Sequence, residues 1–116
     1  RMVAISSLGA QRAMPNYGFI GASKAALESL VRTLAQELGP RGIRVNAVSA
    51  GAVDTDALKY FPNREQVLAM YADRTPAERQ LTAQDVADAV YLLCLPEAAM
   101  VNGHTLVVDG GFSISG

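Results

Sequence analysis

The 116-residue sequence contains one cysteine, Cys94, and one histidine, His104. A single cysteine excludes an internal disulfide and favours a reducing compartment. Cys94 is expected to be a small buried residue on the apolar side of a helix. A single histidine with no partner ligands argues against a metal site, so we expect none.

Charge and long apolar runs are also scarce. Ten lysine and arginine residues face 11 aspartate and glutamate residues, so the formal net charge is −1 at pH 7. This balance gives no electrostatic reason to bind nucleic acid or an anionic membrane. No apolar run approaches the roughly 20 residues that span a bilayer, and the first residues do not resemble a signal peptide. We therefore expect a soluble, cytoplasmic protein with neither nucleic acid nor membrane as a partner.

The residues that are present indicate a packed α/β domain. Half of them are apolar and 18% are charged, which is typical of a globular protein with a substantial core. Nearly all-apolar strands are predicted at 2–5, 43–48 and 105–108, with helices between them. Strands without a polar face indicate a parallel sheet that is covered by helices on both sides.

The sequence marks the helices with different clarity. The longest is predicted to end at Gly39-Pro40. Its apolar side comprises Leu27, Leu30, Val31, Leu34 and Leu38, with Glu28, Arg32, Gln36 and Glu37 opposite. A capping box of Thr82 and Asp85 predicts the start of another helix. Between 52 and 80 the periodicity is weak, apart from a helix predicted around 65–72, and such a stretch is usually functional or mobile.

Three polar side chains are candidates for chemistry: Ser7 at a strand end, Tyr17 at the start of the long helix, and Lys24 within it. Seven helical residues make about two turns, so Tyr17 and Lys24 share a face about 10 Å apart along the axis. Parallel sheets bind ligands beyond the carboxyl ends of their strands, where Ser7 lies. A nearby ammonium favours loss of the tyrosine proton and makes the hydroxyl a better donor. Composition alone favours a simpler interpretation, in which all three side chains are ordinary surface residues.

The order of several short motifs along the chain favours the catalytic interpretation over the simpler one. Ser6-Ser7, Tyr17 and the run Gly21-Ala22-Ser23-Lys24 are followed by Gly42–Gly51 and by Gly103–Gly111. In this order the blocks resemble the active-site half of the short-chain dehydrogenase/reductase family, over essentially the whole chain. The resemblance implies that residues 1–116 form the C-terminal half of one doubly wound, Rossmann-like domain with a nicotinamide cofactor, NADPH or NADH.

The cofactor-binding N-terminal half that the family carries is not among these residues. No G-x-G-x-x-G turn for a pyrophosphate occurs in the sequence. We therefore expect one sheet edge to be unpaired, which favours aggregation. A chain without that half could also be catalytically inert.

The spacing of tyrosine and lysine departs from most of that family. The position four residues before Lys24 is Ile20, and the tyrosine stands seven before it, giving Tyr-x6-Lys. This spacing resembles the family's enoyl-acyl carrier protein reductases of bacterial fatty acid biosynthesis. The segment Ser49–Glu65 is most similar to their third, NADPH-using type, as is Ser7, where other types carry a second tyrosine. A 3-oxoacyl or other carbonyl reductase is the alternative, weakened by Ile20.

The displaced tyrosine has a physical rationale. A carbonyl reductase protonates the oxygen on the carbon that receives hydride. An enoyl reductase delivers hydride two carbons away from the thioester carbonyl, and negative charge develops on that more distant oxygen. A proton donor belongs where charge develops in the transition state. We therefore expect Tyr17 to lie farther along the helix than the tyrosine of a carbonyl reductase.

The resemblance also implies roles for individual residues. Tyr17 would hydrogen-bond the enolate oxygen, Lys24 would hold the nicotinamide ribose, and Ser7 would orient the substrate or shape the pocket. The residues expected to line the nicotinamide and pyrophosphate are Ala50, Gly51, Val53 and Thr55. The segment 56–80 would cover the substrate. Its apolar residues would form either an acyl channel or ordinary core; they are Tyr60, Phe61, Leu68, Met70 and Tyr71.

The expected substrate is an enoyl group carried by acyl carrier protein or coenzyme A. Full-length relatives pack the long helix against its copy, which implies a homotetramer. The residues expected on that helix face are Ala25, Ala26, Glu28 and Arg32. Asp109 is expected only to satisfy a turn.

Overall fold

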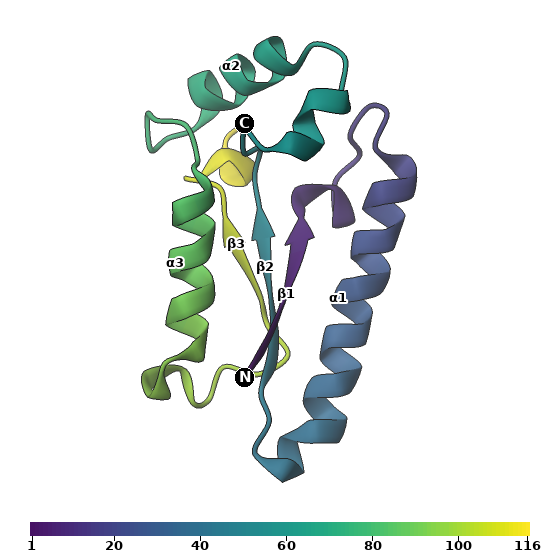
Figure 1. Ribbon diagram of the computed structural model, residues 1–116, viewed down its shortest axis with the longest axis vertical. Coiled ribbons are helices and arrows are strands. Elements are labelled where there is room, and N and C mark those ends of the chain that lie inside the picture. Colours follow the sequence, from purple (N-terminus) through teal and green to yellow (C-terminus); the bar gives the residue numbers. More distant parts are fainter.

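A computed structural model describes all of residues 1–116, with three parallel strands and three α-helices (Figure 1). The strands are β1 (Met2–Ser7), β2 (Val45–Ala50) and β3 (Thr105–Val108). The helices are α1 (Gly18–Leu38), α2 (Arg64–Arg74) and α3 (Ala83–Cys94). The α/β class and the parallel sheet predicted from the sequence are confirmed, with strand ends shifted by at most two residues.

The sheet has the order β1-β2-β3, and β2 is buried on both faces. Helix α1 covers one face and α3 the other (Figure 1). Successive side chains of a strand point to opposite faces, so Ala47 packs with Val31 and Ala35 of α1, while Val48 packs with Ala89 of α3. The apolar sequence of the central strand therefore follows from its two helical neighbours.

Helix α1 packs on the sheet with most of its predicted apolar side, since Val31 is buried and Leu34 and Leu38 pack against the same cluster, but two positions differ. Leu30, assigned to the core from the sequence, is 51% exposed, and that assignment is wrong. Glu28, assigned to the polar side and to a contact between copies, is 4% exposed and bonds to Ser6 of β1. A buried carboxylate with a hydroxyl partner takes the inward position that an apolar residue was expected to fill.

Helix α3 begins with the predicted capping box. The Thr82 hydroxyl accepts a hydrogen bond from the Asp85 backbone N–H at 3.2 Å, and the Asp85 carboxylate accepts one from the Thr82 backbone N–H at 2.8 Å. Arg79 donates two further bonds to this carboxylate. Cys94, at the other end of α3, is exposed, so its predicted burial is wrong; Leu93 turns inward instead.

The hydrogen bonds that Arg79 and Thr82 donate to Asp85 make the stability of the fold depend on pH. Hydrogen bonds from Arg79 and then from Thr82 hold the pKa of the Asp85 carboxyl below its usual value. A lowered pKa stabilises the fold above the unfolded value of about 3.9, and this contribution is lost as pH falls through the folded value. Asp85→Asn is therefore expected to lower the thermal unfolding midpoint by a few degrees at pH 7 and to lose this difference toward pH 2.

The matched control for Asp85→Asn is Asp88→Asn, one turn along α3. Asp88 is exposed and accepts a hydrogen bond only from Gln84. Its replacement is expected to leave the midpoint nearly unchanged at every pH. Equal effects of the two variants on the midpoint at pH 7 would contradict the stabilising role given to the Asp85 carboxylate.

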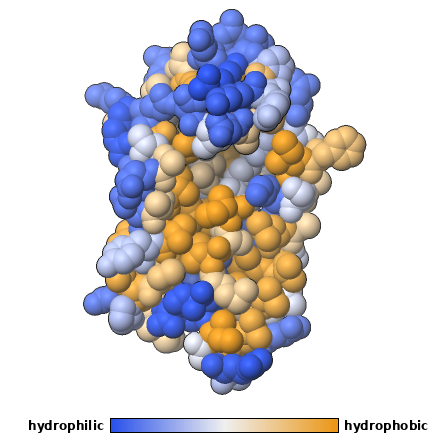
Figure 2. Space-filling view, viewed as in Figure 1, coloured by the Kyte–Doolittle hydropathy of each residue, from blue (hydrophilic) through white to orange (hydrophobic).

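Strand β1 lies at an edge of the sheet and pairs only with β2. Met2 and Ile5 of this strand are 48% and 46% exposed. Figure 2 shows apolar residues gathered over the middle of the molecule, between the two helices. The predicted unpaired edge is therefore present, and it offers backbone groups to a further strand.

No helix of the chain combines the length and apolar character that a membrane crossing requires.

Candidate functional site

The parallel strands bring three strand ends together at one end of the sheet (Figure 1). β1 ends at Ser7, β2 at Ala50 and β3 at Val108. The chain leaves each strand there in a loop or turn, and α2 lies beyond this end of the sheet. This is the edge at which open parallel sheets bind their ligands.

The structure brings Ser7 and Tyr17 together. Ser7 ends β1 and caps a short 3-10 turn, Leu8–Ala10, by accepting a hydrogen bond from the Gly9 N–H at 3.1 Å. Tyr17 stands immediately before α1, and its hydroxyl donates to Ser7 Oγ at 3.0 Å. Ser7 Oγ therefore accepts two hydrogen bonds, and its own hydroxyl hydrogen remains available to a third group.

Two glycines, to which the sequence pattern gave no role in the site, allow the close packing around the Tyr17 ring. A Cβ added to Gly9 would lie 2.3 Å from two ring carbons of Tyr17, and a Cβ added to Gly21 would lie 2.6 Å from the Gly9 carbonyl oxygen. On another side, the Phe61 ring lies 6.1 Å from the Tyr17 ring between centroids, tilted by 39°. The ring is thus held between the 8–10 turn and Phe61. The glycine that follows the strand end two residues after Ser7 was the only sequence signal for this contact.

Lys24 lies on the same side of α1 as Tyr17 but reaches a different atom. Its ammonium donates to the Ile5 carbonyl oxygen of β1 at 2.8 Å. Tyr17 and Lys24 thus both contact β1, as the seven-residue spacing predicts. This bond uses one of the three ammonium hydrogens, so two remain for other acceptors.

The end of β2 and the loop after it contain the remaining predicted residues. Ala50 and Val53 are half-buried, whereas Thr55 is exposed. Thr55 precedes a 3-10 segment, Asp56–Tyr60, and its hydroxyl makes no capping bond there. The Gly51 N–H donates to the Val108 carbonyl, and a Cβ at Gly51 would lie 3.1 Å from Asp109 Cβ. Glycine at this position therefore lets the ends of β2 and β3 approach closely.

The five apolar residues expected to form either an acyl channel or ordinary core separate into different environments. Phe61 contacts Tyr17, and Tyr71 is buried in a cluster with Leu8 and Phe112. The Tyr71 and Phe112 rings stack 4.0 Å apart, and burial raises the pKa of the Tyr71 hydroxyl. The other three do not join this cluster: Tyr60 is 88% exposed, Met70 is 42% exposed and Leu68 is half-buried.

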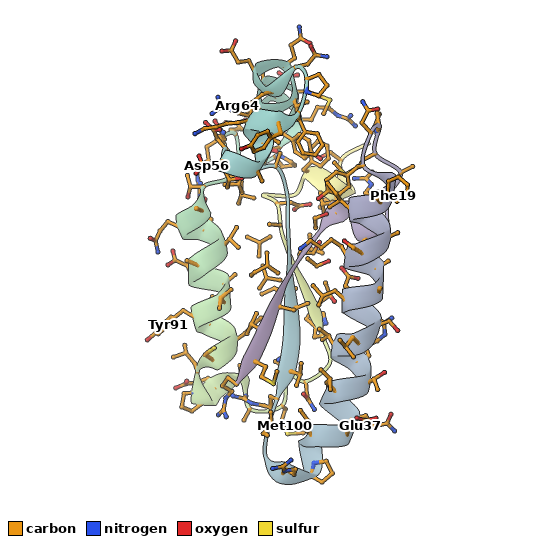
Figure 3. All side chains as sticks on the ribbon, turned by 45° about the vertical axis from the view of Figure 1, so that its right-hand side comes forward. Phe19, Glu37, Asp56, Arg64, Tyr91 and Met100 are labelled. Atoms are coloured by element: carbon orange, nitrogen blue, oxygen red, sulfur yellow. The ribbon has the colours of Figure 1, made fainter.

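Two contacts tie the segment that contains α2 to the strand ends. Arg64, at the start of α2, forms an ion pair with Asp54 in the loop after β2. Figure 3 shows Arg64 and Asp56 at the same end of the molecule as α2. Tyr71, near the other end of α2, packs on Leu8, which follows Ser7. The segment is therefore anchored both at the start of α2 and near its end.

The turn after β3 is organised by Asp109. Its carboxylate accepts hydrogen bonds from the backbone N–H groups of Gly111 at 2.9 Å and Ser113 at 2.8 Å. Burial opposes ionisation here, but these bonds outweigh it and hold the pKa of the Asp109 carboxyl below its usual value. The predicted turn role of Asp109 is confirmed.

A family model described as "Enoyl-(Acyl carrier protein) reductase" matches residues 1–113. Among curated proteins, the 1-cyclohexenylcarbonyl-CoA reductase of Streptomyces collinus is 48% identical, over 98% of this chain and 41% of its own length. The enoyl-[acyl-carrier-protein] reductase [NADH] FabI of Escherichia coli K12 is 42% identical, over 98% of this chain and 44% of its own length. The chain thus spans less than half the length of these relatives.

Solved structures agree with the sequence relatives. The Bacillus cereus enoyl-acyl carrier protein reductase, determined with NADP+ and indole naphthyridinone, superposes with a TM-score of 0.94 at 37% identity, covering 98% of this chain and 44% of that one. A putative oxidoreductase from E. coli K-12 gives a TM-score of 0.79 at 29% identity, covering 98% of this chain and 42% of that one. The resemblance to short-chain reductases and the Rossmann-like fold is thereby confirmed. The chain belongs to the enoyl-(acyl carrier protein) reductase family.

Proposed function

We propose that the protein reduces the carbon–carbon double bond of an enoyl thioester with hydride from NADPH or NADH, in fatty acid biosynthesis. The observation that carries this proposal is the Tyr17 hydroxyl, held 3.0 Å from Ser7 Oγ at the carboxyl ends of the strands. Family membership and the printed names of the relatives support the reaction class. Those names also support an enoyl group carried by acyl carrier protein or coenzyme A.

In the proposed reaction, Tyr17 stabilises the negative charge that develops on the substrate. When hydride is added two carbons from the thioester carbonyl, negative charge develops on the carbonyl oxygen. A hydroxyl that donates to this oxygen stabilises the charge where it forms. Ser7 Oγ accepts the Tyr17 hydrogen bond in the structure, so it keeps the hydroxyl oriented until the substrate oxygen takes its place. The Phe61 ring lies beside the tyrosine ring, 6.1 Å away between centroids.

The residues present fit the nicotinamide end of the cofactor, which supplies the hydride when bound. Lys24 has two free ammonium hydrogens for ribose hydroxyls. The Thr55 hydroxyl, which caps nothing, is available to a phosphate oxygen. Ala50, Gly51 and Val53 would line the nicotinamide beside them. Because no glycine-rich turn occurs in the sequence, the adenosine end would be held by residues outside these 116.

Several finer points belong to the same proposal. Residues 1–116 would form the C-terminal part of one catalytic domain. Ser7 and the segment Ser49–Glu65 favour the third, NADPH-using type. A homotetramer would use the exposed face of α1 at Ala25, Ala26 and Arg32; Glu28 is removed from that face by its burial. Cytoplasmic placement still rests on the lone cysteine.

The test compares two substrates on the complete natural polypeptide. We expect oxidation of NADPH, or of NADH, to accompany reduction of a crotonyl thioester but not of an acetoacetyl thioester. Turnover of the acetoacetyl thioester alone would instead assign a carbonyl reductase. Turnover of neither substrate would remove the support for an acyl thioester substrate.

A further inference from the structure

We infer that Glu28 is a positioning residue for Tyr17, acting through the two ends of the turn that supports the tyrosine. The inference rests on the proposed function in one respect, because its kinetic consequence is read in enoyl reduction. Glu28 lies in α1, eleven residues after Tyr17 and four after Lys24. It is 4% exposed.

The Glu28 carboxylate joins two residues that flank this turn. Oε1 accepts a hydrogen bond from Ser6 Oγ at 2.6 Å, and Oε2 accepts one from Gln11 Nε2 at 3.2 Å. Ser6 is the residue before Ser7, and Gln11 is the residue after the 3-10 turn Leu8–Ala10. One carboxylate thus fastens both ends of the turn to α1.

Two residues between these bonds touch Tyr17. Ser7 Oγ accepts the tyrosine hydroxyl, and Gly9 lies against the tyrosine ring. Tyr17 stands at the start of α1 and Glu28 lies near its middle, and both face β1. The turn is therefore held at its ends by Glu28 and between them by Tyr17. A shift of the turn along α1 would separate Ser7 Oγ from the Tyr17 hydroxyl.

Stability alone does not account for this carboxylate. No cation pairs with Glu28, since the ion pairs of the chain are Lys59–Asp56, Arg64–Asp54 and Arg79–Asp85. Removing a carboxylate from water is costly, and two neutral donors satisfy only part of its acceptor capacity. An apolar side chain in line with Val31 and Ala35 would avoid that cost. What the carboxylate adds is a fixed distance to two hydrogen-bond donors on the turn.

The first test is kinetic, with the complete natural polypeptide. Glu28→Gln keeps the size of the side chain but replaces one acceptor oxygen by a donor. We expect kcat for crotonyl thioester reduction to fall about tenfold, with KM nearly unchanged. In a Tyr17→Phe background the same substitution should cause no further loss, because its effect passes through Tyr17. A loss of equal size in both backgrounds would overturn the inference.

The second test does not depend on activity. Amide hydrogen exchange at Gly9, Gln11 and Arg12 reports on the turn, because these N–H groups bond to Ser7 Oγ or to the Leu8 carbonyl. Glu28→Gln is expected to raise these exchange rates at least about tenfold and to leave the amides of β2 unchanged. Unchanged rates in the turn, or a uniform rise throughout the chain, would overturn the inference even if no enoyl thioester is turned over.

Two further variants complete the design. Ser6→Ala removes one of the two bonds without altering α1, so it should change the same amides in the same direction, by a smaller factor. Ser6→Ala replaces Glu28→Gln in the exchange test if Glu28→Gln does not fold. Glu37→Gln makes the same chemical change at an exposed position near the end of α1 (Figure 3) and should change neither kcat nor exchange in the turn.

Discussion

Replacing Tyr17 by phenylalanine is expected to lower kcat for enoyl thioester reduction by about 10²- to 10³-fold, the usual effect of removing one donor to a developing oxyanion. The substitution removes only the hydroxyl that donates to Ser7 Oγ at 3.0 Å. The ring would stay between Gly9 and Phe61, so the fold and the thermal midpoint should change little. Steady-state kinetics of the complete natural polypeptide with a crotonyl thioester, together with thermal unfolding, measure both effects.

The control for this variant is Tyr91→Phe, which makes the same chemical change on α3. Tyr91 is 65% exposed and points away from the sheet (Figure 3). Its loss should leave kcat unchanged. If Tyr17→Phe kept wild-type kcat, the hydroxyl would not be the group that stabilises the oxyanion, and Ser7 would become the candidate donor.

Features that depend on neighbouring residues in the sequence were predictable. The strand 105–108 has the predicted bounds, and the capping box of Thr82 and Asp85 forms as expected. Ser7 was expected at the carboxyl end of a strand and Tyr17 at the start of a helix, ten residues later, and both lie there. In each case a short stretch of chain determines the geometry.

Features decided by distant residues were not predictable. The burial of Glu28 depends on Ser6, 22 residues earlier, and periodicity alone placed that carboxylate in solvent. Tyr71 stacks on Phe112, and no local pattern connects these two positions. In both cases a contact with a residue far away in the sequence, Ser6 for Glu28 and Phe112 for Tyr71, decided the environment that local periodicity could not predict.

The two wrong assignments in α1, at Glu28 and Leu30, have a common geometric cause. The rotation of a helix about its axis determines which of its positions face the sheet and which face solvent. With Tyr17 and Lys24 turned toward β1, Glu28 falls inward and Leu30 falls outward. The exposed Leu30 and the buried Glu28 therefore follow from one rotation of the helix about its axis.

The second large effect is expected at Gly9, where no side chain can be added without moving the Tyr17 ring. The Cβ of an alanine would lie 2.3 Å from ring carbons Cδ1 and Cε1, far inside contact distance. Gly9→Ala should displace either the ring or the turn, separate the hydroxyl from Ser7 Oγ, and lower kcat by about 10²-fold. Kinetics with a crotonyl thioester, and exchange of the Gly9–Arg12 amides, measure the two consequences.

Gly18→Ala provides the comparison that makes the Gly9 result specific. It is the same substitution at the first residue of α1, where an added Cβ meets nothing within 4 Å and alanine favours the helix. It should keep kcat and leave stability equal or slightly higher. Only one of the two glycines that flank Tyr17 in the sequence would then be sensitive to alanine, which a general loss of backbone freedom does not explain. Wild-type kcat in Gly9→Ala would mean that catalysis tolerates a displaced tyrosine ring, and the role given to the Ser7–Tyr17 contact would have to be abandoned.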